Sequence, residues 1–194
     1  MEGVLTPEIW IAVAERTGIE GLRRTTRDEP DYDVLMRGRL ALLREHGLGL
    51  RAIQEVIAGL TPLPGAVAFL RTLRERAPVV ILSDTFEQFA APLVRQLGHP
   101  TLLCHRLVVE DDRIVDYRLR LPDQKRAAVA AFRSLNYRVL AAGDSYNDTA
   151  MLRAADRGFL FRAPAPVREA FPRFPASETY DELLDAFRRE LDAA

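Results

Sequence analysis

The sequence predicts an α/β protein, a doubly wound parallel sheet preceded by a helical segment. After residue 62, short apolar runs alternate with helical stretches, as in a sheet covered by helices on both faces. The run 79–82 lacks polar alternation, which is typical of a buried parallel strand. A Pro-Leu-Pro-Gly cluster at 62–65 ends the earlier helical part. These three observations define the fold class.

Each element follows from its own pattern. Ile9, Trp10, Val13 and Ala14 lie at helix spacing and predict a helix that stops at Gly18. Further apolar stripes extend over 34–43 and 50–60. The runs 102–109 and 113–119 flank the acidic residues 110–112, which predicts an antiparallel hairpin. The other expected elements are strands at 79–82, 138–142 and 158–161, helices at 66–76, 86–97, 124–135, 148–155 and 181–191, and a helix from 164.

Length and composition fit one globular domain with room for a small insertion. The chain has 194 residues, of which 48% are hydrophobic, and a formal net charge of −1. This charge gives no reason to expect nucleic acid as a partner, and no apolar run reaches the roughly 18 residues of a membrane span. Cys104 is the single cysteine, and no signal peptide pattern is visible. We therefore expect a cytoplasmic protein without a nucleic-acid or membrane partner.

The strongest local pattern is Gly-Asp-Ser-Tyr-Asn-Asp at 143–148, directly after the apolar run 138–142. It places Asp144 and Asp148 at the carboxyl end of a probable buried strand, where open α/β sheets bind ligands. Mg²⁺ prefers oxygen ligands, commonly one or two protein carboxylates. The alternative is that Ser145 or Asp148 only caps the next helix. The full run behind a buried strand favours the functional interpretation.

Two further positions complete a set suited to phosphate chemistry. Ser83 and Asp84 follow the apolar run 79–82, where a hydroxyl beside helix N–H groups suits a phosphoryl oxygen. Lys125 precedes an Ala-rich helical run and could neutralise a phosphoryl group. Taken singly, Ser83 could be a helix cap and Lys125 a solvated lysine. The prediction of a phosphate site therefore rests on the occurrence of Ser83-Asp84, Lys125 and the 143–148 run together and in this order.

Ser83-Asp84, Lys125 and the 143–148 run, in this order and on these elements, resemble motifs two, three and four of the haloacid dehalogenase (HAD) superfamily. The stretches 2–10, 31–36, 81–86 and 141–149 resemble the bifunctional phosphoserine phosphatase/homoserine phosphotransferase family of the ThrH type. The resemblance implies a HAD-like core, formed by 1–6 and 63–194, with a helical cap at 7–62. It also implies Mg²⁺ as cofactor, phosphoserine as substrate and homoserine as a second acceptor.

The resemblance also implies roles for individual residues. Glu2 would be the catalytic acid and base, and Glu2 (through its main-chain carbonyl), Asp144 and Asp148 (in an orienting role) would form the metal site. Glu8, Arg39, Ser83, Asp84, Lys125 and Asn147 would bind substrate. Glu8 would contact its ammonium group and Arg39 its carboxylate, although Arg37 or Arg44 could be confused with Arg39.

One part of the family pattern is missing. The first HAD motif is an apolar strand ending in Asp-x-Glu-Gly-Val, whose leading aspartate is the nucleophile. Here Glu2 falls on the second acid, so we expect the nucleophile and its strand to be absent from the sequence. A start codon assigned too far downstream explains this, and a degenerate enzyme is the alternative. Another HAD phosphatase, acting on a sugar phosphate or nucleotide, and a catalytically inactive binding module also stay open. A homodimer is expected only from base rates.

Overall fold

The computed structural model describes residues 1–26, 28–29 and 31–193, so residues 27 and 30 of the predicted cap lie outside the described part. The first elements are α1 (Ile9–Thr17), η1 (Glu20–Arg23), α2 (Tyr32–Glu45), α3 (Leu50–Ala58) and α4 (Ala66–Arg74). β1 (Val80–Phe86), α5 (Glu87–Gln96), β2 (Thr101–Glu110), β3 (Arg113–Arg118), α6 (Gln124–Ser134) and β4 (Leu140–Gly143) follow. The last are η2 (Tyr146–Asp148), α7 (Thr149–Ala154), β5 (Arg157–Phe161), α8 (Ala165–Ala170), β6 (Ala176–Ser177) and α9 (Tyr180–Asp192).

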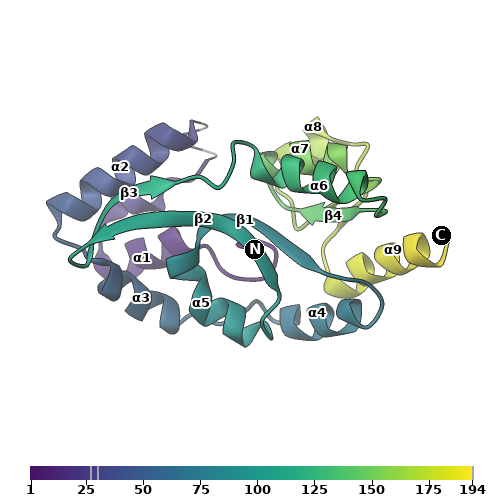
Figure 1. The fold of residues 1–194 in the computed structure, drawn as a ribbon, viewed down its shortest axis with the longest axis horizontal. Helices are drawn as coiled ribbons and strands as arrows, with labels where there is room; N and C mark the ends of the chain where they lie inside the picture. Colours follow the sequence, from purple (N-terminus) through teal and green to yellow (C-terminus); the bar gives the residue numbers. More distant parts are fainter. Residues whose placement is uncertain (27, 30, 194) are drawn as a thin grey trace.

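Parallel strands flanked by helices confirm the predicted α/β class (Figure 1). The described strands nevertheless form two three-stranded sheets, in the orders β1-β2-β3 and β4-β5-β6, where the sequence predicted one. β1 pairs with β2 in parallel, and β4, β5 and β6 are all parallel. β1 and β4 are therefore edge strands among the described residues. The sheets are divided because no strand in the described part of the chain pairs with the inner edges of β1 and β4, and the cavity described below lies between these edges.

Helices on both faces join the two sheets. α5 packs on β1 and β2, while α6 contacts β1 and α7, and α7 contacts β4 and β5. On the side of α4 and α9, aromatic rings make the connection. Phe69 of α4 stacks on Tyr180 of α9 at 5.1 Å, and Phe187 of α9 meets Phe159 of β5 edge-on at 5.1 Å. The two sheets are thus held at a fixed separation by packing across them.

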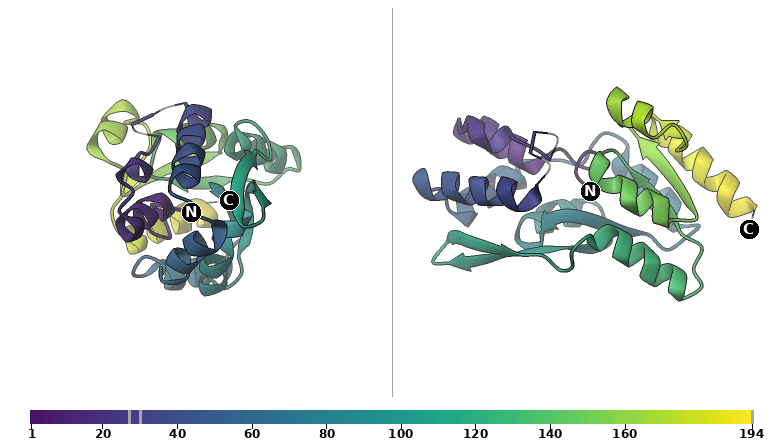
Figure 2. Two further views of the ribbon diagram at one scale, coloured as in Figure 1. Left: turned by 90° about the vertical axis from the view of Figure 1, so that its left-hand side faces the viewer. Right: turned by 90° about the horizontal axis from the view of Figure 1, so that it is seen from above.

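The segment α1–α3 packs against the end of the molecule that carries the β2–β3 hairpin (Figures 1 and 2). Asp31 caps α2 by accepting hydrogen bonds from the main-chain N–H groups of Asp33 and Val34. The hairpin turn touches α3, where Leu50 N donates to Asp112 O at 2.7 Å. Because one buried cluster runs through both parts, the division into a cap at 7–62 and a core stays a prediction.

The hairpin is confirmed, with a turn at Asp111 and Asp112, whose φ angles are 47° and 70°. β1 is longer than the predicted 79–82, because its polar residues through Phe86 continue the parallel pairing with β2 across an irregular register. The predicted helix 148–155 is η2 followed by the short α7, and the two-residue β6 was not predicted. No helix in the described part of the chain is long and apolar enough to cross a membrane.

Candidate active site

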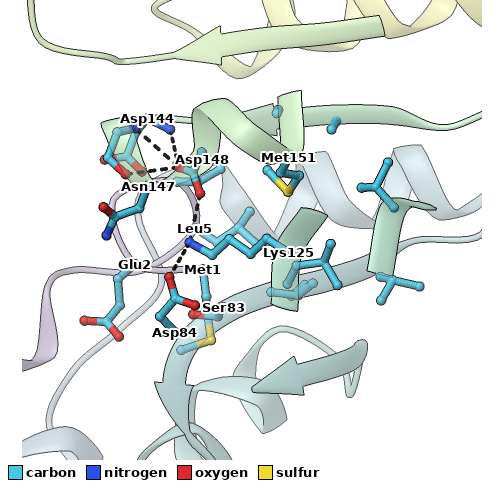
Figure 3. A pocket seen from close by; sticks show the side chains of 18 of the residues that line it. Met1, Glu2, Leu5, Ser83, Asp84, Lys125, Asp144, Asn147, Asp148 and Met151 are labelled. Atoms are coloured by element: carbon cyan, nitrogen blue, oxygen red, sulfur yellow. Dashed lines mark hydrogen bonds and ion pairs between the residues drawn. The ribbon is translucent and has the colours of Figure 1, made fainter. Parts of the chain in front are cut away.

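A cavity of about 640 Å³ lies between the two sheets (Figure 3). All nine residues predicted for the site line it: Glu2, Glu8, Arg39, Ser83, Asp84, Lys125, Asp144, Asn147 and Asp148. We call the part lined by these residues the polar end. The rest is apolar and is lined by β1, β4, α4 and α9, and we call it the strand slot. The structure therefore brings together residues that are up to 146 positions apart in the sequence, from Glu2 to Asp148.

Lys125 lies at the centre of the polar end. Its ammonium nitrogen is 2.8 Å from Asp84 Oδ2 and 2.9 Å from Asp148 Oδ1. Although burial opposes its charge, the two carboxylates raise the pKa of Lys125 above its ordinary value. Lys125 is the only lysine in the sequence, and every other residue in the combined count of lysine and arginine is an arginine. A compact ammonium with three rotatable donors can direct one N–H group to each of the two carboxylates.

Asp148 is held by both of its oxygens. Oδ1 pairs with Lys125, and Oδ2 accepts hydrogen bonds from the main-chain N–H groups of Asp144 (3.0 Å) and Ser145 (3.3 Å). Gly143 makes this possible, since a Cβ there would lie 2.5 Å from Asp148 Cγ. Burial opposes the charge of Asp148, but Lys125 and these donors hold its pKa below the ordinary range. Ser145 and Asp148 form a capping box at η2, as the helix-cap alternative predicts, and the functional interpretation stays a prediction. The two main-chain hydrogen bonds let Asp148 orient the Asp144 loop.

The donor set beside this loop is suited to Mg²⁺. Asp144 is buried, and a Cβ on Gly3 would lie 2.5 Å from its Oδ2, so only glycine leaves room for this carboxylate. Glu2 Oε2 accepts a hydrogen bond from Ile9 N at 2.9 Å, which directs the Glu2 side chain to the start of α1. Within the described residues, no group of three His, Cys, Asp or Glu is arranged for a metal ion. The oxygen donors near Asp144 still match Mg²⁺, because this ion prefers oxygen ligands and commonly takes only one or two carboxylates from the protein.

Ser83 and Asn147 lie on opposite sides of the polar end. Ser83 is buried in β1, with its hydroxyl 3.4 Å from Thr85 N. Asn147 is exposed, and its amide donates to Thr26 Oγ1 at 3.0 Å, which links the β4–α7 loop to the helical segment. Both positions allow contact with a ligand in the cavity.

Arg39 forms the other charged part of the cavity wall. It is only 7% exposed, its Nη2 donates to Arg24 O at 2.8 Å, and its guanidinium lies 4.6 Å from the centre of the Trp10 ring. Burial lowers the pKa of Arg39 to about 10, opposed by nearby groups that include Glu2 and Glu8. Its Nε is buried without a hydrogen-bond partner among the described residues. Arg37 and Arg44 are exposed, so Arg39 is the arginine of α2 that faces the cavity.

Three polar residues behind the site were not predicted. Tyr32 donates through its hydroxyl to Asp84 O at 3.0 Å, and Gln124 donates to Ser83 O at 2.6 Å. His105 has no metal-ligand spacing in the sequence, which predicts a surface or loop residue, and this prediction is wrong. His105 is 4% exposed in β2, with Nε2 at 3.5 Å from Asp84 Oδ1. None has a spacing signal, although Tyr32 lies in a stretch that carries the family resemblance.

The strand slot is lined by apolar side chains from the edges of two strands. Ile81 and Leu82 of β1 line it on one side and Leu140 and Ala142 of β4 on the other. Lys125 pairs with Asp84 in β1 and with Asp148 beyond β4, so the carboxyl ends of both strands meet at the polar end. β1 and β4 therefore run in the same direction, and both lead to the charged groups of Lys125, Asp84 and Asp148.

Comparisons with known proteins agree on one family. A sequence profile for haloacid dehalogenase-like hydrolases matches residues 3–156. A phosphoserine phosphatase of Pseudomonas syringae pv. tomato is 64% identical over 96% of this chain and 79% of its own length. The phosphoserine phosphatase ThrH of Pseudomonas aeruginosa is 63% identical, over 96% and 92%. A solved substrate-bound phosphoserine phosphatase complex shares the fold, with a TM-score of 0.80 and 21% identity over 96% of this chain and 94% of that one.

Proposed function

Because the chain belongs to the haloacid dehalogenase-like hydrolase family, we propose that it is a phosphoserine phosphatase that uses Mg²⁺ and releases serine and phosphate. One observation carries the proposal. The ammonium of Lys125 and the guanidinium of Arg39 line the same cavity, together with the carboxylate of Glu8. Phosphoserine carries a phosphate, a carboxylate and an ammonium group, so each of its charges finds an opposite charge there.

At the phosphoryl end, Ser83 and Lys125 bind the phosphoryl oxygens. The Lys125 ammonium has two carboxylate partners and three N–H groups, which leaves one donor for the substrate. Asn147, at the mouth of the cavity, binds the transferring group. Asp84 contributes by holding Lys125 in place.

At the amino-acid end, Arg39 binds the substrate carboxylate and Glu8 the ammonium. The unpartnered Nε of Arg39 supports this, because a buried guanidinium N–H without an acceptor is costly and a carboxylate would satisfy it. This distribution of charge favours an amino-acid phosphate over a sugar phosphate or a nucleotide. The helical segment 7–62, which supplies both side chains, acts as the cap.

Asp144 and the main-chain carbonyl of Glu2 are the groups of this chain that would hold Mg²⁺, with Asp148 orienting the loop. When bound, the ion would screen the repulsion between an anionic nucleophile and the anionic phosphate. The cradle left by Gly3 beside the Asp144 carboxylate supports this placement.

The nucleophile is an aspartate on a further parallel strand that fills the strand slot. Its carboxylate oxygen forms a bond to phosphorus while the bond to the serine oxygen breaks, and Glu2 gives that oxygen its proton. Glu2 then takes a proton from water, whose oxygen attacks phosphorus and releases phosphate and the carboxylate. If homoserine replaces water, the same intermediate gives phosphohomoserine.

The test compares the 194-residue chain with the same chain extended at Met1 by an apolar strand ending in Asp-x. With Mg²⁺ and phosphoserine, we expect phosphate release from the extended chain and none from the shorter one. The matched control is the extension ending in Asn-x, which should fold and stay inactive. An extended, folded chain that is inert would support the binding-module alternative, and equal rates with glucose 6-phosphate or a nucleotide would support another substrate.

Two finer proposals are tested with the same material. Phosphohomoserine in a reaction with added homoserine would support the transferase activity, and its absence would contradict it. The homodimer rests on base rates alone and is tested by light scattering on the extended chain.

A further inference from the structure

Beside Lys125 lies a buried polar cluster of three residues, of which only Asp84 also lines the cavity where substrate is proposed to bind. It consists of His105, Gln124 and the Oδ1 side of Asp84, and we call it the His105 cluster. His105 is 4% exposed and Gln124 is 5% exposed. Buried polar groups of this kind are costly unless they are paired, so their arrangement calls for an explanation.

The hydrogen bonds of His105 define which ring nitrogen carries the proton. Arg120 N donates to His105 Nδ1 at 3.1 Å, so Nδ1 is the acceptor. In the neutral ring the proton is then on Nε2, which faces Asp84 Oδ1 at 3.5 Å. Gln124 Nε2 also lies 3.4 Å from His105 Nε2, but it is itself a donor, to Ser83 O at 2.6 Å. Asp84 is thus the acceptor available to the His105 proton.

The second oxygen of Asp84 leads to the active site. Asp84 Oδ2 lies 2.8 Å from Lys125 Nζ, so one carboxylate joins the imidazole to the ammonium. We infer that His105 is a positioning residue, which fixes the Asp84 carboxylate through its Nε2–H and so holds the Lys125 ammonium where the phosphoryl group binds. The main-chain N–H of Arg120 holds the ring in the required tautomer.

A purely structural role of the imidazole is the competing explanation. The ring packs against Tyr32 and Phe86, with ring centres 6.2 Å and 6.4 Å away. Packing depends on the shape of the ring, whereas positioning depends on a donor at Nε2. Substitutions can separate the two, because glutamine places an N–H near the Nε2 position, asparagine places an oxygen near the Nδ1 position, and phenylalanine keeps only the ring.

The first arm of the test is spectroscopic and does not need activity. Lys125 is the only lysine, so lysine labelled with ¹⁵N at Nζ gives one side-chain signal in the 194-residue chain. We expect His105→Gln to keep this signal close to that of the unsubstituted protein. His105→Asn and His105→Phe should move it toward the shift of free lysine, and the exposed His46→Asn is the matched control that should leave it unchanged.

The second arm measures phosphoserine hydrolysis in the strand-extended chain, and this arm alone depends on the proposed function. A misplaced Lys125 ammonium should lower kcat about tenfold in His105→Asn and His105→Phe, while KM changes less than about twofold. His105→Gln should stay within about threefold of the unsubstituted kcat.

The opposite ranking overturns the inference. If His105→Phe keeps the lysine signal and the rate while His105→Gln loses them, the ring acts only by packing. An unchanged lysine signal in all three variants overturns it as well. A strand-extended chain without phosphatase activity would overturn the proposed function, and the lysine signal would still decide the role of His105.

Discussion

The polar end of the cavity has two charged parts, the phosphoryl end around Lys125 and the amino-acid end around Arg39, and their side chains are held in different ways. At the phosphoryl end, Lys125 has two carboxylate partners, and Asp148 accepts further hydrogen bonds from the main chain. At the amino-acid end, Arg39 has one main-chain acceptor and an aromatic ring, and its Nε has no partner among the described residues. The charged side chains Lys125, Asp84 and Asp148 at the phosphoryl end are thus paired with one another, whereas the amino-acid end has a donor that a ligand would satisfy.

This difference follows from where the residues come from. The phosphoryl end is built from the carboxyl ends of parallel strands and from the start of α6, which sheet pairing and helix packing hold in place. The amino-acid end comes from α2 and the residue before α1, in the helical segment. We therefore expect substitutions at the first end to affect both stability and rate, and substitutions at the second to affect substrate binding alone.

Lys125→Met should have the largest effect. It leaves Asp84 and Asp148 as buried carboxylates without their partner, so the free energy of unfolding should fall by about 3 kcal/mol. In the strand-extended chain, kcat/KM for phosphoserine should fall about 1,000-fold. Urea unfolding and a phosphate-release assay check the two effects. The control is the exposed neighbour Arg126→Met, and a Lys125→Met protein within tenfold of normal activity would contradict the assignment.

Arg39→Met should separate binding from stability. Loss of a charged donor to the substrate carboxylate should raise KM for phosphoserine about 10- to 100-fold. Because burial already lowers the pKa of Arg39 to about 10, removing this buried charge should leave the free energy of unfolding within about 1 kcal/mol of its normal value. Arg37→Met, on the same helix but exposed, is the matched control. A larger KM change in the control than in Arg39→Met would reverse the assignment.

Gly3→Ala tests the place of Mg²⁺ at the phosphoryl end. The new Cβ would lie 2.5 Å from Asp144 Oδ2, so the carboxylate must move, and the Mg²⁺ concentration for half-maximal activity should rise about tenfold. Gly18→Ala is the control, since its φ of 72° matches the 73° at Gly3 while nothing lies within 4 Å of the added Cβ. Both should lose about 1 kcal/mol of stability. An equal Mg²⁺ requirement in the two variants would exclude Asp144 as a ligand.

The same comparison shows what the sequence could predict. Ser83, Asp84, Lys125 and the 143–148 run could be placed together, because the sequence predicted one parallel sheet with all of its carboxyl ends at one edge. In the structure β1 and β4 lie in separate sheets, and Lys125 still joins Asp84 to Asp148. The extent of β1 could not be predicted, since its polar residues beyond Leu82 interrupt the apolar run and are kept in the strand by pairing with β2. Local pattern therefore predicted which residues line one cavity, but not the full length of the strand that carries Ser83 and Asp84.

His105 and Tyr32 were missed for a related reason. Their partner Asp84 lies 21 and 52 positions away in the sequence, and neither residue stands in a repeat or a ligand spacing. Contacts of this kind arise only when β2 and α2 pack beside β1. The residues proposed to bind ligands at the phosphoryl end lie in local motifs, whereas the residues that contact them from behind are brought in by tertiary packing.

Asp84→Asn should change the free energy of unfolding only modestly at neutral pH, and its effect on stability should be seen most clearly in acid. Burial opposes the charge of Asp84, but His105, Lys125 and Gln124 hold its pKa below the ordinary value near 4. A carboxyl with a depressed pKa in the folded state stabilises the protein fully above that ordinary value, and the stabilisation is lost as the pH falls below it. The variant should therefore lose about 1 kcal/mol at pH 7 and show a shallower fall of unfolding free energy below about pH 4, measured by urea unfolding. The exposed Asp123→Asn should keep the normal slope, and an Asp84→Asn curve parallel to it would show that the phosphoryl end does not depend on this carboxylate.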